Sequence, residues 1–238
     1  MQKTAFQTIK KILLDLLFPI YCVGCGASGV HLCKKCAEIL QQSAITPSCV
    51  ICSLRNFSGN TCKTCQKYTH IKKWLWCFNY KNPAIRSALH RYKYKRIQTL
   101  GIALSELVQN VLISQEIRLP KNILVAPIPL SRAKERERGF NQALPIAKTI
   151  ADMFRATLIT DALVRKVHNP PQAQINDFKK RQKNVQGIFR VKNRDAIRGK
   201  TILLVDDVTA SRSTLEEAAC VLRTAGAKSV WAFVIAKG

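Results

Sequence analysis

The stretch ILLVDDVTASRSTL, residues 202–215, decides the fold. Its first four residues form a continuous apolar run, which is typical of a strand buried on both faces of a parallel sheet. A helix is expected to follow, with Ser213 and Glu216 in the spacing of a capping box and Gly226 at the helix end. Ser229–Ile235 has the composition of the next strand. The sequence therefore predicts a strand–helix–strand unit of an α/β fold.

Two adjacent acids, Asp206 and Asp207, follow the apolar run directly. Open α/β sheets bind ligands at the carboxyl ends of their strands. Carboxylates there can accept hydrogen bonds from ribose hydroxyls or help to hold a divalent metal on a polyphosphate, and the N–H groups of the next helix can bind phosphate. The alternative is an ordinary turn with two solvated aspartates. The position of both acids at the end of a buried strand favours a nucleotide site.

This stretch resembles the phosphoribosyl-diphosphate (PRPP) signature of type I phosphoribosyltransferases. The resemblance implies that the acid pair binds ribose hydroxyls, that the following loop binds the 5′-phosphate, and that Mg²⁺ accompanies PRPP. Ala210 and Ser211 stand where the family has two threonines, and Arg212 stands where it has glycine. Arg212 either supplies a cation or blocks the pocket. The predicted PRPP-binding residues are Asp206, Asp207, Thr209, Ala210, Ser211, Arg212, Ser213 and Thr214.

The chain carries a large positive charge. Its 238 residues include 39 Lys and Arg against 14 Asp and Glu, which gives a formal net charge of +25. Such an excess indicates a polyanionic partner, namely nucleic acid, nucleotides or anionic lipid. Solubility alone requires a much smaller net charge, and it rarely requires an excess of charges of one sign only. Since 47% of the residues are apolar, the chain can also bury a core in one large or two smaller domains.

The N-terminal residues 1–19 are expected to form a separate amphipathic helix. Apolar residues recur near helical spacing in Thr4–Phe18, which favours a helix packed on the protein. Its lysines leave binding to a membrane surface open. The apolar run is too short and too polar to span a bilayer, and no cleavage site of a signal peptide follows it. A cytoplasmic location is therefore expected.

Eight of the ten cysteines form four C-x-x-C pairs within residues 20–70. Two thiolates from one tight turn suit zinc, so the pairs predict two structural Zn²⁺ sites of four thiolates each, in a small N-terminal zinc-ribbon domain. Sequential and cross-braced pairing both fit the spacing. A redox role is less favoured, because a thioredoxin-like strand–helix context is missing. Cys77 and Cys220 are expected in the core. The predicted ligands are Cys22, Cys25, Cys33, Cys36, Cys49, Cys52, Cys62 and Cys65.

Two basic segments are candidates for nucleic-acid binding. HRYKYKR, residues 90–96, interleaves tyrosines with cations, as single-strand binding requires. It equally fits a solvated helix end whose tyrosines pack inward. Residues 165–191 lack a long apolar periodicity before Ile188, which predicts a long basic loop that ends in a short strand. The predicted nucleic-acid-binding residues are Arg91, Tyr92, Lys93, Tyr94, Lys95, Arg96, Lys179, Lys180, Arg181 and Lys183.

A second buried strand is expected at Ile123–Ile128, followed by SRAKERERGFNQ at 131–142. In a two-strand nucleotide site this basic stretch faces the acid pair. Arg132 and Arg138 are then the predicted pyrophosphate-binding residues. The alternative is an exposed helix of mixed charge. Gly139 permits a turn before the next helix, and this favours a loop that belongs to the site.

The whole chain resembles the ComF (ComFC) family of competence proteins. The resemblance rests on the cysteine-rich front and on four stretches: YKNPAIRSALHRYKYK at 80–95, VAPIPLSRAKERERGFNQA at 125–143, RQKNVQGIF at 181–189 and LLVDDVTASRSTL at 203–215. It implies an α/β fold in which residues 71–238 form a type I phosphoribosyltransferase-like parallel sheet flanked by helices, behind the zinc ribbons. It also implies handling of incoming single-stranded DNA in natural transformation, with a DNA-translocating helicase and recombination loaders as partners.

Three functional hypotheses follow. The leading hypothesis is a protein that binds single-stranded DNA on a PRPP-binding scaffold, so its affinity should fall steeply with salt. The second is an active phosphoribosyltransferase with an unknown acceptor, in which arginine stabilises the departing pyrophosphate. The third is an adaptor that binds a protein partner through its zinc region. Binding of DNA with and without PRPP and Mg²⁺ distinguishes the first two.

Overall fold

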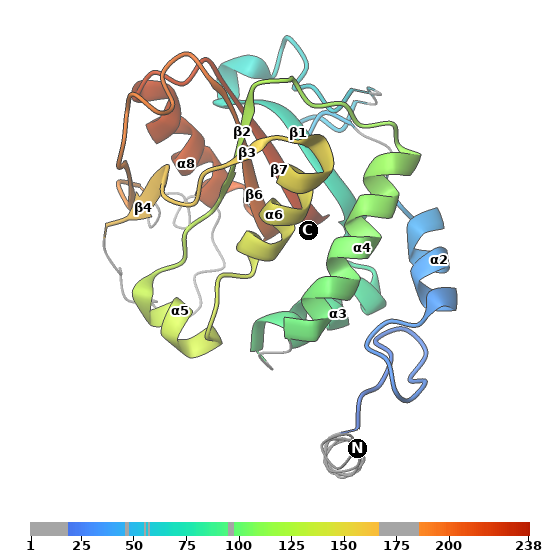
Figure 1. Ribbon diagram of the computed structural model, residues 1–238. Helices are drawn as coiled ribbons and strands as arrows, with labels where there is room; N and C mark the ends of the chain where they lie inside the picture. The colour runs from blue at the N-terminus through green and yellow to red at the C-terminus, as the bar shows by residue number, and fades with distance from the viewer. Residues whose placement is uncertain (1–18, 46–47, 55, 57, 95–97, 167–185) are drawn as a thin grey trace.

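The computed structural model of the chain describes residues 19–45, 48–54, 56, 58–94, 98–166 and 186–238 (Figure 1). The expected N-terminal helix lies outside these residues. The same holds for six of the predicted nucleic-acid-binding residues: Lys95, Arg96, Lys179, Lys180, Arg181 and Lys183.

A five-stranded parallel sheet forms the centre of the fold, in the order β1-β7-β6-β2-β3. The run Ile202–Val205 lies in β6, which pairs with β2 on one side and β7 on the other. Its four side chains are at most 1% exposed, so the prediction of a strand buried on both faces is confirmed. The strands are β1 (Ile71–Asn79), β2 (Ile123–Pro127), β3 (Thr157–Leu158), β6 (Thr201–Thr209) and β7 (Ser229–Lys237).

The side chains of β6 alternate between two core layers. Leu203 and Val205 pack in a layer with the helices α3 (Pro83–Tyr94), α4 (Gln98–Ser114) and α6 (Ala143–Phe154). Ile202 and Leu204 pack on the other face with α8 (Ser213–Thr224) and with the antiparallel hairpin of β4 (Leu163–Arg165) and β5 (Phe189–Val191). Figure 1 shows these helices around the sheet. The expected parallel sheet flanked by helices is therefore confirmed.

The cysteine-rich region packs against both core layers. Val23 and Leu40 belong to the layer of α4, and Val50 belongs to the layer of α8. Helix α2 (Lys34–Gln42) lies beside α4 (Figure 1), and a 3-10 turn, η1 (Gln66–Tyr68), precedes β1. The region is therefore joined to the sheet through shared apolar contacts.

The basic stretch after β2 is a short helix, α5 (Arg132–Arg138), and the expectation of a loop is wrong. Ser131 explains the helix start, since its hydroxyl accepts a hydrogen bond from the Lys134 N–H at 3.3 Å. Gly139 ends the helix with φ of 80°, a left-handed conformation that glycine adopts without strain. Caps at both ends thus stabilise a helix of only seven residues.

None of the helices in the described part of the chain is long and apolar enough to cross a membrane.

Candidate functional site

The acid pair lies at the carboxyl end of β6. Neighbouring strand residues point to opposite faces, so Asp207 faces the layer of α3, while Asp206 acts on Arg165 of β4. Asp207 is only 4% exposed, and its N–H donates to Asp206 Oδ1 at 2.8 Å. The alternative of two solvated aspartates is therefore wrong.

Lys93 of α3 forms an ion pair with Asp207. Its Nζ lies 3.0 Å from Asp207 Oδ1, and the two side chains are 15% and 6% exposed. The other carboxylate oxygen, Oδ2, is buried and has no hydrogen-bond partner in the described structure. Burial and the charge of Asp207 also raise the pKa of Tyr92. Lys93 thus balances the charge of Asp207 through Oδ1 and leaves Oδ2 without a partner among the described residues.

Asp206 is the acid whose ionisation is disfavoured. Burial raises its pKa to about 7, and the neighbouring Asp207 carboxylate adds to the shift. The Asp207 N–H and Lys93 oppose that shift without cancelling it. A carboxyl group that titrates near neutral pH can accept a hydrogen bond from a ribose hydroxyl when it is ionised, or donate one to it when it is protonated.

A cluster of cations lies next to the acid pair. Burial lowers the pKa of Lys134, and the nearby charges of Arg138, Arg165 and Lys93 lower it further. The Nε atoms of Arg138 and Arg165 are buried and have no hydrogen-bond partner among the residues that the structure describes. Buried unpaired donors are rare in folded proteins and indicate an absent partner. An anion with several oxygens would supply such partners.

Two contacts fix Arg138 within this cluster. Its Nη1 donates to Gln142 Oε1 at 2.9 Å, and its guanidinium carbon lies 5.5 Å from the centre of the Tyr94 ring. The prediction that Arg138 faces a ligand stays a prediction, but its unpaired Nε supports it. Arg132 instead lines a cleft of about 360 Å³ at the carboxyl end of β2, together with Asn141 and Arg165.

The loop between β6 and α8 has the backbone that a glycine would favour. Arg212 adopts φ of 64°, in the left-handed region, and its N–H donates to Thr209 Oγ1 at 3.1 Å. The side chain extends to the cysteine-rich region, where Nη1 donates to the Val50 carbonyl at 3.4 Å. Arg212 thus occupies the family's glycine position in a glycine-like conformation and contacts the residue after Cys49.

The expected capping box is wrong. The N-cap of α8 is Arg212, which makes no side-chain capping bond, and Ser213 is already helical. Glu216 instead accepts a hydrogen bond from the Thr69 hydroxyl and one from the His70 N–H, the latter at 3.0 Å. The first turn of α8 is therefore held by residues from the end of the cysteine-rich region.

The structure corrects two of the predicted nucleic-acid contacts. Tyr92 is fully buried and donates its hydroxyl to the Gln142 carbonyl at 3.1 Å, so it offers no face for stacking. Lys93 is paired with Asp207. Tyr94 is 55% exposed, and Arg91 donates to the Tyr21 carbonyl at 3.2 Å. One tyrosine of the segment packs inward and the other is exposed.

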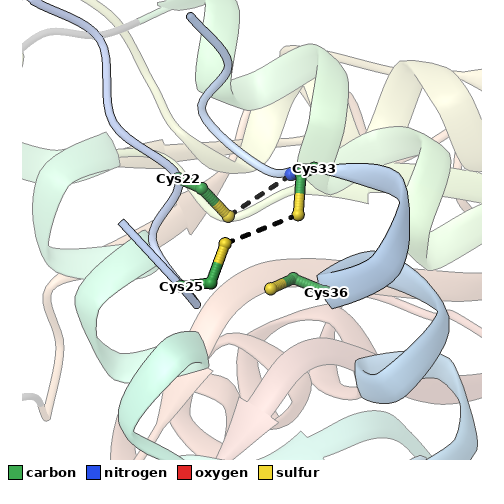
Figure 2. Close-up of side chains that lie close together, drawn as sticks. All are labelled: Cys22, Cys25, Cys33 and Cys36. Carbon is green, nitrogen blue, oxygen red and sulfur yellow. Dashed lines mark hydrogen bonds between the residues drawn. The ribbon is translucent and has the colours of Figure 1, made fainter. Parts of the chain in front are cut away.

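The eight paired cysteines form two groups of four. The sulfurs of each group lie within 4.8 Å of one another, and the grouping is sequential: Cys22, Cys25, Cys33 and Cys36, then Cys49, Cys52, Cys62 and Cys65. Figure 2 shows the first four sulfurs turned toward a common centre. The closest sulfurs are 3.7 Å apart in one group and 3.6 Å in the other. Zn–S bonds of about 2.3 Å place tetrahedral sulfurs about 3.8 Å apart, so both groups fit zinc.

Backbone N–H groups stabilise a thiolate in each group. Burial opposes ionisation of Cys22, but N–H groups of Cys33, Cys25 and Gly24 lower its pKa to about 6. Cys49 follows the same pattern, with its pKa again lowered to about 6. Because zinc binds the thiolate, these amides favour the form that a metal requires. In contrast, burial raises the pKa of Cys77, which belongs to the core as expected.

Comparison with known proteins finds relatives that match most of the chain. Residues 141–238 match the phosphoribosyl transferase domain family. Competence protein ComFC of Bacillus subtilis is 27% identical over 218 residues, which cover 86% of this chain and 83% of that protein. Competence protein F of Haemophilus influenzae is 22% identical over 92% of this chain and 98% of its own length. DNA utilization protein YhgH of Salmonella typhimurium is 25% identical, with shares of 84% and 87%. The chain is thus similar to ComF-type competence proteins over most of its length.

Solved structures similar to this chain include the glutamine PRPP amidotransferase from Bacillus subtilis in complex with ADP and GMP. It has 15% sequence identity and a TM-score of 0.37, and the match covers 57% of this chain. The chain spans about a quarter of that structure, 26% of its length. A second, described as the allosteric regulatory enzyme of purine biosynthesis, has 18% identity, a TM-score of 0.39 and the same two shares.

Sequence reasoning missed three cations of the site. Lys93 was assigned to nucleic acid by its basic neighbours, and Lys134 and Arg165 were not assigned. Lys134 carries a signal, since it lies among the cations just beyond a buried strand. Arg165 carries none, because β4 is only three residues long and reaches the site through a hairpin with β5.

Proposed function

We propose that this chain is a ComF-type competence protein, which binds a phosphorylated ribose, PRPP, at the acid pair and takes part in handling single-stranded DNA in the cytoplasm during natural transformation. The observation that carries the first part is a set of buried atoms of both polarities without partners. Asp207 Oδ2 is an acceptor, and the Nε atoms of Arg138 and Arg165 are donors. A sugar hydroxyl and a diphosphate satisfy these two needs together.

Different residues around the acid pair would bind different groups of the ligand. In this proposal, ribose hydroxyls donate to Asp206 and Asp207, and the diphosphate accepts hydrogen bonds from Arg138 and Arg165. The residues 209–214 place backbone N–H groups at the start of α8, where a 5′-phosphate is favoured. Mg²⁺ would enter bound to the diphosphate, which presents the oxygen ligands that this ion prefers.

Lys93 does not have to leave for the ligand to bind. Its ammonium group forms an ion pair with Oδ1 of Asp207, while Oδ2 has no hydrogen-bond partner in the described part of the chain. A hydroxyl can therefore bind the carboxylate while the ion pair stays formed. The ammonium then lies beside the ribose and adds positive charge near the diphosphate.

The DNA part of the proposal rests on charge and on the named relatives. Two relatives are named competence proteins and one a DNA utilization protein, and this chain has a net charge of +25. Tyr94, which is 55% exposed, can stack on a base. Contacts of this kind release counterions, so binding should weaken by orders of magnitude between about 50 and 200 mM salt. A helicase and recombination loaders remain proposed partners.

Calorimetry with PRPP and Mg²⁺ tests the ribose-phosphate site. We expect binding by the zinc-loaded chain and at least a tenfold loss in Asp207→Asn, since one hydrogen bond to a charged group contributes about 1.5–3 kcal/mol. Asp195→Asn, at an exposed acid beyond β5, is the matched control and should bind as the parent does. A folded parent chain that binds no PRPP at millimolar concentration would overturn the proposal.

A second candidate function is phosphoribosyl transfer to an acceptor. The cleft of about 360 Å³ beside Arg165 favours it, because it offers space for another molecule next to the proposed diphosphate site. Its polar lining includes Asn141, Thr160 and Asp161. Release of pyrophosphate from PRPP in the presence of an acceptor would support transfer. Tight PRPP binding without release, across nucleobases and amines, would leave the chain as a binding protein.

A further inference from the structure

A second pocket lies between α8 and the β4–β5 hairpin. Its volume is about 270 Å³, and it contacts the C-terminal half of α8 at Cys220 and Val221. The acid pair lies beyond the opposite end of this helix, before Ser213. Since a helix rises 1.5 Å per residue, Cys220 lies about 10 Å along α8 from Ser213. The pocket is thus separate from the proposed PRPP site.

Cations surround this pocket on the hairpin side. Lys166, Arg190 and Arg194 line it, and all three are exposed. The carboxylate of Glu217, one turn earlier on α8, accepts a hydrogen bond from the Gly187 N–H, which lies 2.6 Å from its Oε1. Asp195 is adjacent to Arg194 in the chain. The balance of charge around the pocket is therefore positive.

The positive charge continues beyond the pocket along one edge of the molecule. Residues 186–200 and 218–230 contain seven Lys and Arg and a single acid, Asp195. One of them, Lys192, is paired with Asp161 at 3.0 Å. The others include Arg198, Lys200 and Lys228, which are exposed around the end of α8 and the start of β6. A polyanion that enters the pocket would meet cations on both sides of it.

The wall of the pocket is partly apolar. Val191, Val221 and Ala225 line it and are only partly buried, so their apolar surface is open to a ligand. Unlike the site on β6, the pocket has no carboxylate among the described residues that line it, so none of these residues would accept hydrogen bonds from ribose hydroxyls as an acid does. Its volume is just below the range of about 300–1,000 Å³ typical of small-molecule sites. It therefore suits one small ligand with an anionic group and a flat apolar part.

We propose that the pocket between α8 and β5 binds a nucleoside monophosphate group, either as the free nucleotide or as one unit of a single strand. The phosphate would contact Arg190 and Arg194, since guanidinium groups form paired hydrogen bonds with phosphate oxygens. The base would cover the apolar wall of Val191 and Val221. This site is independent of the PRPP part of the proposed function, since it needs neither the acid pair nor PRPP, and binding of a strand would rest on the DNA part.

The chain carries its own reporter for this pocket. Cys220 lies in the lining and is partly exposed. Cys77 is 1% exposed, and the other eight cysteines belong to the two zinc-type groups. In the zinc-loaded chain, alkylation should therefore occur first at Cys220, and a ligand in the pocket should slow it.

The experiment measures alkylation of Cys220 by iodoacetamide in the full zinc-loaded chain at low salt, by peptide mass spectrometry. The probes are dAMP, a deoxythymidine strand of about 12 nucleotides, and inorganic phosphate. A ligand at ten times its Kd leaves about one site in eleven empty, so the rate should fall about tenfold. Protection by dAMP and by the strand identifies the free nucleotide as sufficient, and protection by the strand alone identifies the polymer as the ligand.

Matched variants decide whether the pocket is responsible. Arg190→Ala with Arg194→Ala should lose the protection, while Lys34→Ala with Lys35→Ala, which removes two exposed cations from α2, should keep it. Asp207→Asn should also keep it, so that failure of the PRPP site is distinguished from failure of this one. Thermal unfolding confirms that each variant is folded. Absence of protection, equal protection by inorganic phosphate, or protection that persists without both arginines would overturn the proposal.

Discussion

The ammonium nitrogen of Lys93 lies 3.0 Å from Asp207 Oδ1, and both side chains are largely shielded from water. An ion pair in such a place stabilises the fold only while both partners are present, because a single buried charge is poorly solvated. A second pair in the chain, Lys192 with Asp161, has the same separation of 3.0 Å but is 58% and 59% exposed. The two pairs allow a direct comparison of burial at equal geometry.

We expect Lys93→Met to lower the free energy of unfolding by about 3 kcal/mol, because it leaves the Asp207 carboxylate buried without a counter-charge. Lys192→Met should cost less than about 1 kcal/mol, since water screens an exposed pair. Urea denaturation of both variants measures the difference. Adding Asp207→Asn to Lys93→Met should recover part of the loss. Equal effects of the two lysine substitutions would contradict this account of the site.

The pH dependence of stability should carry the signature of Asp206. Its pKa is raised from 3.8 to about 7, so between these values the folded chain binds a proton that the unfolded chain has released. Stability from this group is therefore present below pH 4 and is lost as pH rises toward 7. We expect the parent chain to lose stability from pH 5 to 7 relative to Asp206→Asn. Urea denaturation at fixed zinc concentration tests this, and parallel curves for the two proteins would refute it.

The backbone of Arg212 predicts an unusual order of substitutions. Its φ of 64° suits glycine but strains any residue with a Cβ. Arg212→Ala loses the contact with Val50 and keeps the strain, whereas Arg212→Gly loses the contact and relieves the strain. The glycine variant should therefore be more stable than the alanine variant by about 1 kcal/mol. Thermal unfolding measures this, and the reverse order would show that the left-handed conformation is not adopted.

Loss of metal from either of the two zinc-type groups should loosen a different part of the phosphoribosyltransferase-like sheet region. The second group connects to the start of α8 through Arg212 with Val50 and through Glu216 with Thr69. The first connects to α3 and α4 instead, where Arg91 contacts Tyr21 and His31 contacts Thr99. Hydrogen exchange after loss of either metal distinguishes these connections.

Cys62→Ser with Cys65→Ser should therefore increase exchange in the residues 209–216 of the proposed phosphate loop. Cys33→Ser with Cys36→Ser is the matched control and should increase exchange mainly in α3 and α4. Each pair removes two thiolates from one group and leaves the other intact. If both variants increase hydrogen exchange in the phosphate loop equally, the specific contacts of the second group do not explain why this loop is ordered.

Much of the fold could be predicted because its signals are local. Four apolar residues in β6 identify a strand buried on both faces, and C-x-x-C pairs identify metal ligands within a few residues of each other. The capping box was wrong for a reason that no local pattern reveals. Glu216 has partners at Thr69 and His70, more than 140 positions earlier in the chain, and these replace the bond to its own helix.

The site could be predicted only in part for the same reason. Asp206 and Asp207 follow an apolar run that can be recognised in the sequence. Lys93, in contrast, lies on a helix more than 110 residues earlier in the chain. In the sequence, Tyr92 and Tyr94 have the same basic neighbours. Only the packing of α3 against Phe140 and Gln142, just before α6, distinguishes the buried ring of Tyr92 from the exposed ring of Tyr94, since the two side chains leave the helix in different directions.

The order of strands has a consequence for synthesis on the ribosome. Each cysteine group spans at most 17 residues, Cys49–Cys65 being the longer, so it can take up metal soon after it emerges. In contrast, the strand of the sheet that pairs with β1 is β7, which is the last of the described strands in chain order. The aromatic β1 therefore has no neighbour within the sheet until β7 has been synthesised, and such an open edge invites association with other chains. The early metal-bound segments, which pack beside β1, would be the first part of the nascent protein able to protect it.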